Sequence, residues 1–215
     1  MSIALIGSHR TGKTTLARLF AEKHDMPFVQ TGASDVFRAL KLDPKVEYPI
    51  DQRIAIQAVI LGAFEDQYRH AIKSYSGMFI TDRSPLDLAS YMLADIQRST
   101  LVLTPALATA VNLYVDKCIK STNRFFSLVV LVQPGIVTVE AEGKAPACPA
   151  FMEHMNALCT GLMGDERVET QCRVIPRRHT DLDRRVTCIE HAISGTYDKH
   201  EKRMEALVND GLQIH

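Results

Sequence analysis

The feature that most constrains this chain is a glycine-bracketed loop that follows a short apolar run at the N-terminus. Residues 3–6 read Ile-Ala-Leu-Ile, and residues 7–14 then fit the pattern G-x-x-x-x-G-K-[ST]. Such a loop wraps a chain of phosphates with backbone N–H groups when a strand precedes it and a helix follows. Apolar residues recur at helical spacing over residues 13–23, which supplies that helix. The start of the chain therefore predicts a site for a nucleoside triphosphate, and we expect ATP.

Individual positions of the loop have distinct expected tasks. Gly7 and Gly12 allow backbone angles and a close approach that a Cβ would forbid. Lys13 is expected to place its ammonium on the β- and γ-phosphates, and the Thr14 hydroxyl is expected to ligate Mg²⁺. Arg10 either touches phosphate or is solvated. The residues assigned to the nucleotide are Gly7, Ser8, His9, Arg10, Thr11, Gly12, Lys13, Thr14 and Thr15.

Bulk properties narrow the class of protein. The chain has 215 residues, with 25 Lys plus Arg against 25 Asp plus Glu, so there is no global basic field to hold nucleic acid. A local basic face remains compatible with that balance. No apolar run approaches a membrane span, so we expect no membrane partner. The five cysteines are odd in number and form no C-x-x-C pair, which favours free thiols in a reducing cytoplasm, bacterial or phage-infected.

Apolar runs and helical patterns alternate along the chain. This alternation predicts an α/β fold, a single P-loop NTPase domain over residues 1–215 with a five-stranded parallel sheet and helices on both faces. Residues 139–149 lack a regular pattern and form a candidate lid, in which Lys144 could swing onto phosphate. The alternative for Lys144 is a solvated loop residue. Strands are expected at 3–6, 27–30, 78–81, 126–132 and 172–175, and helices at 13–23, 34–40, 51–73, 86–94, 104–122, 151–163, 182–194 and 197–209.

A second group of polar residues follows the expected strand at 78–81. Ligands of doubly wound sheets bind at the carboxyl ends of the strands, so this segment should meet the phosphate-binding loop. Asp82 is assigned to Mg²⁺, together with Thr14, and to catalysis, where it would take the proton of an acceptor hydroxyl. The alternative is a turn or helix-capping aspartate. Arg83 is expected to bind an acceptor phosphate or the transferring phosphoryl group.

Residues from two further segments are expected to contact the second substrate. Arg53 and Gln57 lie four apart on a predicted helix and so share a face, and the Gln57 amide could read the edge of a base. The alternative for Gln57 is a satisfied polar residue at the helix surface. The residues assigned to the acceptor are Gln30, Thr31, Asp35, Arg53 and Gln57.

Residues 173–185 form the most basic segment and hold five arginines. They could contact ATP, an acceptor phosphate or a nucleic-acid backbone. Alternatively, the arginines pair with Asp181 and Asp183 at an exposed helix start.

Several motifs together carry a resemblance to a known family. The chain resembles small AAA-type ATPase and kinase proteins of bacteria and their phages, and is similar to ribosylnicotinamide kinase domains and to nucleoside and nucleotide kinases. In that family an acidic-Arg-Ser element supplies a base and a phosphate-binding arginine, which the resemblance transfers to Asp82 and Arg83. A phage branch phosphorylates 5-hydroxymethyluracil within DNA, and this chain is of comparable size. The motifs lie at residues 6–15, 30–37, 53–57, 81–87, 175–176 and 180–185.

The sequence also departs from that family at one place. Arginine-rich lids are common among nucleotide kinases, whereas residues 139–149 offer only Lys144. This departure puts a catalytic role of the lid in doubt.

Two classes of function remain after these observations. The first is a kinase that uses ATP and Mg²⁺ to phosphorylate a hydroxyl of a nucleoside-type acceptor, free or within DNA. The second is an ATP-hydrolysing switch with water as acceptor, which would need a further Asp or Glu after an apolar strand. The run at 126–132 ends instead in Gln133-Pro134-Gly135, which favours the kinase. Zero net charge weighs against a DNA acceptor, and the arginine segment weighs for it.

Overall fold

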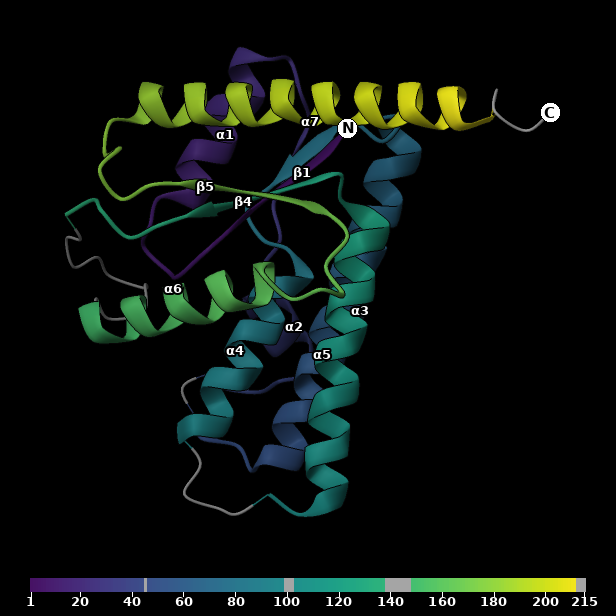
Figure 1. The fold of residues 1–215 in the computed structure, drawn as a ribbon. Coiled ribbons are helices and arrows are strands. Elements are labelled where there is room, and N and C mark those ends of the chain that lie inside the picture. The colour runs from purple at the N-terminus through teal and green to yellow at the C-terminus, as the bar shows by residue number, and fades with distance from the viewer. Residues whose placement is uncertain (45, 99–102, 138–147, 212–215) are drawn as a thin grey trace.

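The sheet of this protein has five strands, all paired in parallel, in the order β2-β3-β1-β4-β5 (Figure 1). The structure is a computed structural model that describes residues 1–44, 46–98, 103–137 and 148–211, with backbone only for 97–98 and 197–211. The strands are β1 (Ser2–Ile6), β2 (Phe28–Val29), β3 (Phe79–Thr81), β4 (Leu128–Val132) and β5 (Gln171–Ile175).

Helices connect successive strands, as parallel pairing requires. The single α/β domain with a five-stranded parallel sheet that the sequence predicts is confirmed. The helices of the described part are α1 (Lys13–Lys23), α2 (Ala33–Ala39), α3 (Ile50–Ser74), α4 (Pro85–Arg98), α5 (Pro105–Phe125), α6 (Pro149–Met163) and α7 (Leu182–Gly211).

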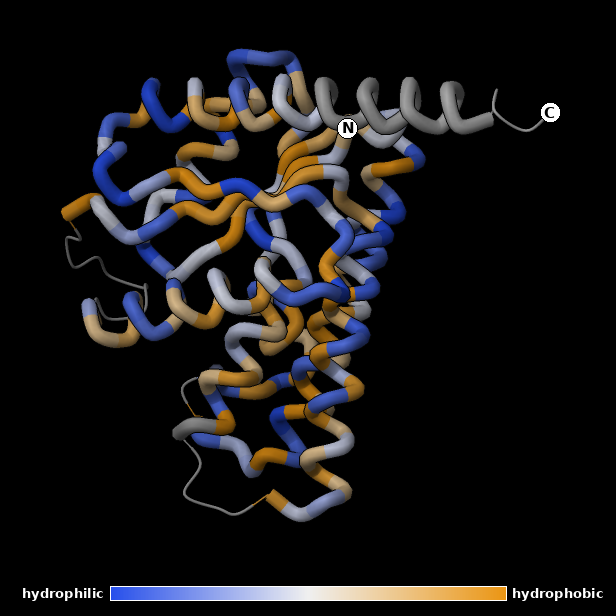
Figure 2. Tube along the Cα trace, viewed as in Figure 1, coloured by the Kyte–Doolittle hydropathy of each residue, from blue (hydrophilic) through white to orange (hydrophobic). Residues whose placement is uncertain are grey.

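The two faces of the sheet are covered by different helices. Ile3, Leu5 and Val130 point to the face that α1 and α7 cover. Ala4 and Leu131, one position on, point to the opposite face, against α3, α4, α5 and α6. This alternation follows from the two-residue period of a strand. Both faces are therefore buried, and Figure 2 shows the central strands as mostly hydrophobic.

Local sequence signals fix where several helices begin. The Thr104 side chain accepts a hydrogen bond from the Leu107 amide, and Pro105 occupies the first turn of α5. Ser84 does the same for α4, because its Oγ accepts from the Leu86 amide, and Pro85 follows it. Proline is favoured there because its missing N–H would have no helical partner. Ser84-Pro85 thus starts α4 directly after the segment that follows β3.

The C-terminal region differs from the sequence-based expectation. Two helices, at 182–194 and 197–209, were expected, but the backbone forms one helix, α7, through Gly195. A glycine inside a helix costs only about 1 kcal/mol relative to alanine. Val186, Ile189 and Ala192 anchor α7 on the sheet before that point, so the glycine does not break it.

Three further expectations concern surface and covalent features. All five cysteines are free thiols, as predicted. Within the described ranges, no helix has the length and apolar character needed to cross a membrane. The candidate lid at 139–149, with Lys144, lies outside the described residues apart from its last two positions.

Candidate functional site

The loop between β1 and α1 has the backbone geometry of a phosphate cradle. Gly7 has φ +135°, and a Cβ on it would lie 2.7 Å from the carbonyl oxygen of Val132 in β4. Gly12, the residue before α1, has φ +85°, and Arg10 lies in the left-handed region at φ 61°. Glycine adopts such angles without steric cost. The loop can therefore curl at the start of α1, where the helix presents its positive end to an anion.

Lys13 lies inside this loop. Its Nζ donates hydrogen bonds to the carbonyl oxygens of Gly7, at 2.7 Å, and Ser8, at 2.6 Å. Burial lowers the pKa of Lys13 to about 8, and Asp87 opposes that shift. The ammonium is thus held inside the loop by two of its carbonyl oxygens, where a phosphate chain would lie. Thr15, in the first turn of α1, is exposed, and its nucleotide role stays a prediction.

Asp82 joins two of the segments that the sequence placed at the edge of the sheet. Thr14 Oγ1 donates to Asp82 Oδ2 at 2.6 Å. Asp82 Oδ1 accepts from the Thr31 amide and hydroxyl, both at 3.3 Å. The loop, the end of β3 and the segment after β2 therefore converge as predicted. Asp82 does not cap α4, because Ser84 occupies that position.

Thr14 and Asp82 form a donor set that fits Mg²⁺. Both offer hard oxygen atoms, and they lie within hydrogen-bond distance of each other. Mg²⁺ is held in such sites by one or two protein oxygens, with phosphate oxygens and waters completing an octahedron. No group of three or more His, Cys, Asp or Glu in the described part of the chain could hold a metal ion alone.

Asp87 is a site residue for which the sequence analysis assigned no role. Its carboxylate is fully buried and accepts from the Gly7 amide at 3.1 Å and from the Ser84 amide at 3.0 Å. Burial raises the pKa of Asp87, while Lys13 and Arg83 oppose that shift. The spacing Ser84-x-x-Asp87 resembles a capping box, which is the sequence signal that could have found it.

Arg83 extends from the same segment towards α4. Its guanidinium lies 5.8 Å from the centre of the Tyr91 ring. The Arg83 carbonyl oxygen accepts from the Tyr68 hydroxyl at 3.1 Å. Tyr68 is itself packed against aromatic rings of β3 and the end of α5. This aromatic packing positions the backbone that carries Asp82 and Arg83.

Two of the predicted acceptor residues lie on the outer surface. Gln30 is exposed, and its Oε1 accepts from Arg18 of α1 at 2.6 Å. Asp35 forms an exposed ion pair with Arg38, one turn along α2, at 3.1 Å. Thr31 is the member of this segment that the structure brings to Asp82.

The other two predicted acceptor residues lie on α3 and face neighbouring helices. Arg53 forms an ion pair with Asp95 of α4 at 2.5 Å. Gln57 Oε1 accepts from the Tyr114 hydroxyl of α5 at 3.3 Å. Both side chains are partly buried, so Gln57 is not a freely solvated surface residue.

The arginine segment does not form one basic face. Arg185 is only 2% exposed and points inward, donating to the Thr11 carbonyl at 2.8 Å and the His179 carbonyl at 2.6 Å. Arg177 forms a two-point ion pair with Glu153 of α6. The sequence analysis missed the contact of Arg185 with the loop. Its helical phase is the signal, since it lies four residues before the buried Ile189.

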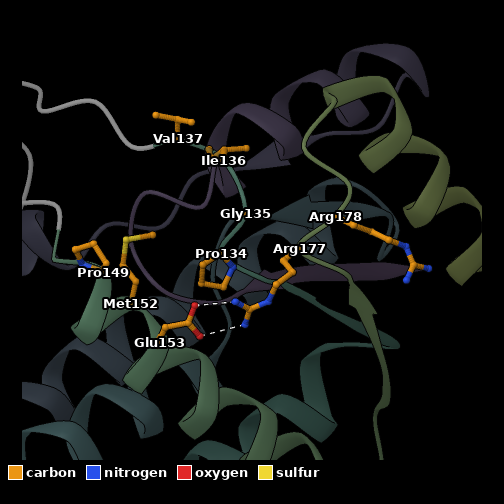
Figure 3. Close-up of a pocket in the computed structure, with 9 residues that line it drawn as sticks. All are labelled: Pro134, Gly135, Ile136, Val137, Pro149, Met152, Glu153, Arg177 and Arg178. Carbon is orange, nitrogen blue, oxygen red and sulfur yellow. Dashed lines mark hydrogen bonds and ion pairs between the residues drawn. The ribbon is translucent and has the colours of Figure 1, made fainter.

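A cavity of about 610 Å³ lies beside the loop (Figure 3). Ile136 on its wall would be 3.4 Å from a Cβ on Gly12, which places the cavity next to the start of α1. In Figure 3, Glu153 and Arg177 face each other at its side. The His9 ring lies 5.6 Å from the Phe151 ring, so α6 also contacts the loop. The lining residues are Pro134, Gly135, Ile136, Val137, Pro149, Met152, Glu153, Arg177 and Arg178.

A family model described as an AAA domain matches residues 2–119, more than half of the chain. The chain belongs to this AAA-domain family. The matched residues include β1, the phosphate-binding loop, Asp82 and Asp87. Comparison with curated proteins gave no match.

Solved structures share the fold of this AAA-domain protein. Deoxyadenosine kinase from M. mycoides with bound dCTP aligns with a TM-score of 0.60 and 13% identity, over 91% of this chain and 100% of the kinase. The NadR protein in complex with NR aligns with a TM-score of 0.64 and 14% identity, over 89% of this chain and 50% of NadR. Thymidylate kinase from Candida albicans aligns with a TM-score of 0.53 and 13% identity, over 91% of this chain and 92% of the kinase. At these identities, the likeness establishes the fold.

Proposed function

We propose that this protein is a kinase that transfers the γ-phosphoryl group of ATP to a hydroxyl of a nucleoside-type acceptor. The observation that carries the proposal is the placement of Asp82. One of its oxygens contacts Thr14 of the phosphate-binding loop, and the other contacts Thr31, after β2. A single carboxylate thus lies between the nucleotide side and the second side of the site, where a phosphoryl acceptor would enter.

The chain's own residues divide the work of such a transfer. Lys13 would bind the β- and γ-phosphates, and Thr14 with Asp82 would hold Mg²⁺. The bound ion would neutralise charge on the phosphate oxygens. Asp82 would also orient the acceptor hydroxyl and accept its proton, and Arg83 would bind phosphate. Phosphoryl transfer depends chiefly on such positioning and electrostatic stabilisation.

The nucleoside class of the acceptor is supported by the shared fold. The structures that align with most of this chain include a deoxyadenosine kinase and a thymidylate kinase. On this chain, Arg53 and Gln57 lie on α3, and Asp95, the ion-pair partner of Arg53, lies on α4 on the same side of the sheet. Their amide, guanidinium and carboxylate groups have the donors and acceptors that a base edge requires.

A small acceptor fits the charge distribution better than DNA does. Arg185 is buried and Arg177 is paired with Glu153, which removes two arginines from a backbone-binding surface. The chain's formal net charge is zero. We therefore propose a free nucleoside or nucleotide as acceptor, and keep 5-hydroxymethyluracil in DNA as the alternative that an assay must include.

An acceptor screen with γ-labelled ATP tests this proposal. The panel contains nucleosides, nucleoside monophosphates, ribosylnicotinamide, and DNA with and without 5-hydroxymethyluracil. We expect label in one nucleoside-type compound. Steady ATP hydrolysis with label in none of them would refute the kinase and support the ATP-hydrolysing switch. If DNA is the acceptor, its binding should weaken steeply with added salt, whereas binding of a free nucleoside should not.

Asp82→Asn tests the residue that carries the proposal. We expect this variant to bind metal-free ATP almost as the unmodified protein does and to lose transfer. The matched control is Asp66→Asn on α3, because Asp66 is 78% exposed and forms its ion pair with Arg69 of its own helix. Transfer by Asp82→Asn at a rate close to that of Asp66→Asn would show that Asp82 is not required.

A further inference from the structure

Asp87 makes contacts that exceed the needs of a helix cap. A carboxylate at this position of a capping box reaches back to the backbone amide of the cap residue. Asp87 does this through Oδ2, which accepts from the Ser84 amide. Its second oxygen, Oδ1, accepts from the amide of Gly7, 80 positions earlier in the chain. One carboxylate therefore binds the first residue of the phosphate-binding loop and the first residue of the turn into α4.

The burial of Asp87 indicates that the link between the two segments does more than cap α4. The residue is 0% exposed, and removing a carboxylate from water is unfavourable unless hydrogen bonds and charges compensate. Two backbone amides supply the hydrogen bonds, and Lys13 and Arg83 supply nearby positive charge. A capping role alone could be met at the protein surface without that cost.

The pairing of the strands does not by itself fix the spacing between the phosphate-binding loop and the segment that follows β3. Strands β1 and β3 are neighbours, but their register ends at the pair Ala4 and Thr81. Gly7 and Asp82 both lie beyond that pair. Thr14 and Asp82 are 68 positions apart, yet their side chains lie within 2.6 Å. The Asp87 carboxylate spans the two segments just past the end of the ladder.

We propose that Asp87 is a positioning residue that sets the spacing between the phosphate-binding loop and the Asp82-Arg83 segment. It thereby keeps the oxygens of Thr14 and Asp82 in register for a metal–nucleotide complex. Asp87 acts through Gly7 and Ser84, whose backbone amides donate to its two carboxylate oxygens. The inference rests on the nucleotide-binding part of the proposed function and does not depend on the identity of the acceptor.

The test measures how strongly Mg²⁺ increases the affinity for ATP. ATP is titrated calorimetrically into the unmodified protein, Asp87→Asn and Ser84→Ala. Each titration is done twice, once in the presence of Mg²⁺ and once in the presence of excess chelator. An asparagine can accept through only one oxygen and carries no charge, so one of the two backbone links is lost. We expect the factor by which Mg²⁺ increases the affinity for ATP to be about 10–100-fold smaller in Asp87→Asn than in the unmodified protein. This is the usual effect of disrupting residues that orient metal ligands. At a pH well below the pKa of Lys13, where the ammonium keeps its proton without Asp87, metal-free ATP affinity should fall by a smaller factor, because the Lys13 contact remains.

Ser84→Ala separates positioning from capping. It removes the hydroxyl that accepts from the Leu86 amide but keeps the Ser84 amide that Asp87 binds. We expect a lower melting temperature with an unchanged Mg²⁺ effect. The full Mg²⁺ effect in Asp87→Asn, whatever its melting temperature, would overturn the proposal and leave Asp87 as a cap.

A measurement on the unmodified protein keeps the proposal testable if Asp87→Asn does not fold. The Gly7 amide should exchange its proton with solvent as slowly as the amides in the core of β1 do, because it donates a hydrogen bond to Asp87. Rapid exchange at Gly7 would overturn the proposal. Failure to find any phosphoryl acceptor would refute the kinase, but would leave both of these measurements unaffected.

Discussion

Replacing Gly7 by alanine tests whether the backbone geometry of the loop is as constrained as the structure indicates. Gly7 has φ +135°, an angle that residues with a Cβ rarely adopt. The added Cβ would lie 2.7 Å from the Val132 carbonyl oxygen and 3.4 Å from Leu131 Cδ1. The closer contact is with the backbone of β4, between β1 and β5 in the sheet. No side-chain rotation can relieve it.

The expected loss of stability has two parts. A residue with a Cβ held at such an angle costs about 1–3 kcal/mol. Displacing a well-packed strand to admit the extra methyl costs a further 1–3 kcal/mol or so. Gly7→Ala should therefore lower the free energy of unfolding by about 2–6 kcal/mol. It should also weaken ATP binding, because the loop amides shift with β1.

Urea denaturation followed by circular dichroism measures the change, and Gly62→Ala is the matched control. Gly62 lies inside α3, and a Cβ there would meet no atom within 4 Å. Alanine at a helix-interior position is favoured by about 0.5–1 kcal/mol over glycine. The same substitution should thus destabilise at one position and stabilise at the other. For Gly7→Ala, the midpoint should fall by about 1 M or more with an unchanged slope.

Equal midpoints for Gly7→Ala and Gly62→Ala would refute this reasoning. So would a Gly7→Ala variant that keeps both the stability and the ATP affinity of the unmodified protein. Either result would mean that the contact between Gly7 and Val132 is not the constraint that the distances imply.

Three further predictions concern buried charges and thiols. Burial lowers the pKa of Lys13 to about 8, so with the phosphate-binding role proposed for its ammonium, ATP affinity should be highest below that pH and fall as pH rises through it. Calorimetry from about pH 7 to about pH 9.5 tests this, and a flat profile would contradict it. Arg185→Met should lower the free energy of unfolding by about 1–3 kcal/mol, because the buried carbonyl oxygen of Thr11 and the partly buried one of His179 lose their donor; unchanged thermal unfolding would show that the contacts contribute nothing. The exposed Cys148 should react first with a thiol reagent, whereas burial raises the pKa of Cys118 and Cys159 to about 12 and should protect both until unfolding. Mass spectrometry of the labelled protein distinguishes these cases.

Much of the fold could be predicted because its signals are local. The helix at Lys13–Lys23 was predicted with its observed bounds, since glycine ends the loop and apolar spacing follows. The five strands were predicted from short apolar stretches, and the clearest of these, at 126–132, is β4, which is buried along its whole length. The C-terminal helix was predicted as two, because a glycine is a weak breaker whose effect depends on the packing around it.

The candidate site was predicted less completely, because its contacts join distant parts of the chain. The convergence of Thr14, Thr31 and Asp82 followed from a general rule about strand ends. Gln30 and Asp35 were assigned to the same place by proximity in sequence, but their side chains contact Arg18 and Arg38. Which member of a short segment faces inward depends on its backbone angles, and apolar patterning does not encode them.

The sequence by itself determined the local pattern of the loop: two glycines, a lysine and a threonine at fixed spacing, flanked by a strand and a helix, form the motif of a phosphate-binding loop. Only the tertiary structure decided which residues hold that cradle in place. Asp87 and Arg185 lie at opposite ends of the loop, bound to Gly7 and Thr11, although they come from α4 and α7. A charge in the sequence is ordinarily expected at the surface. Burial of these two became favourable because the folded backbone presents an amide to the carboxylate and a carbonyl to the guanidinium.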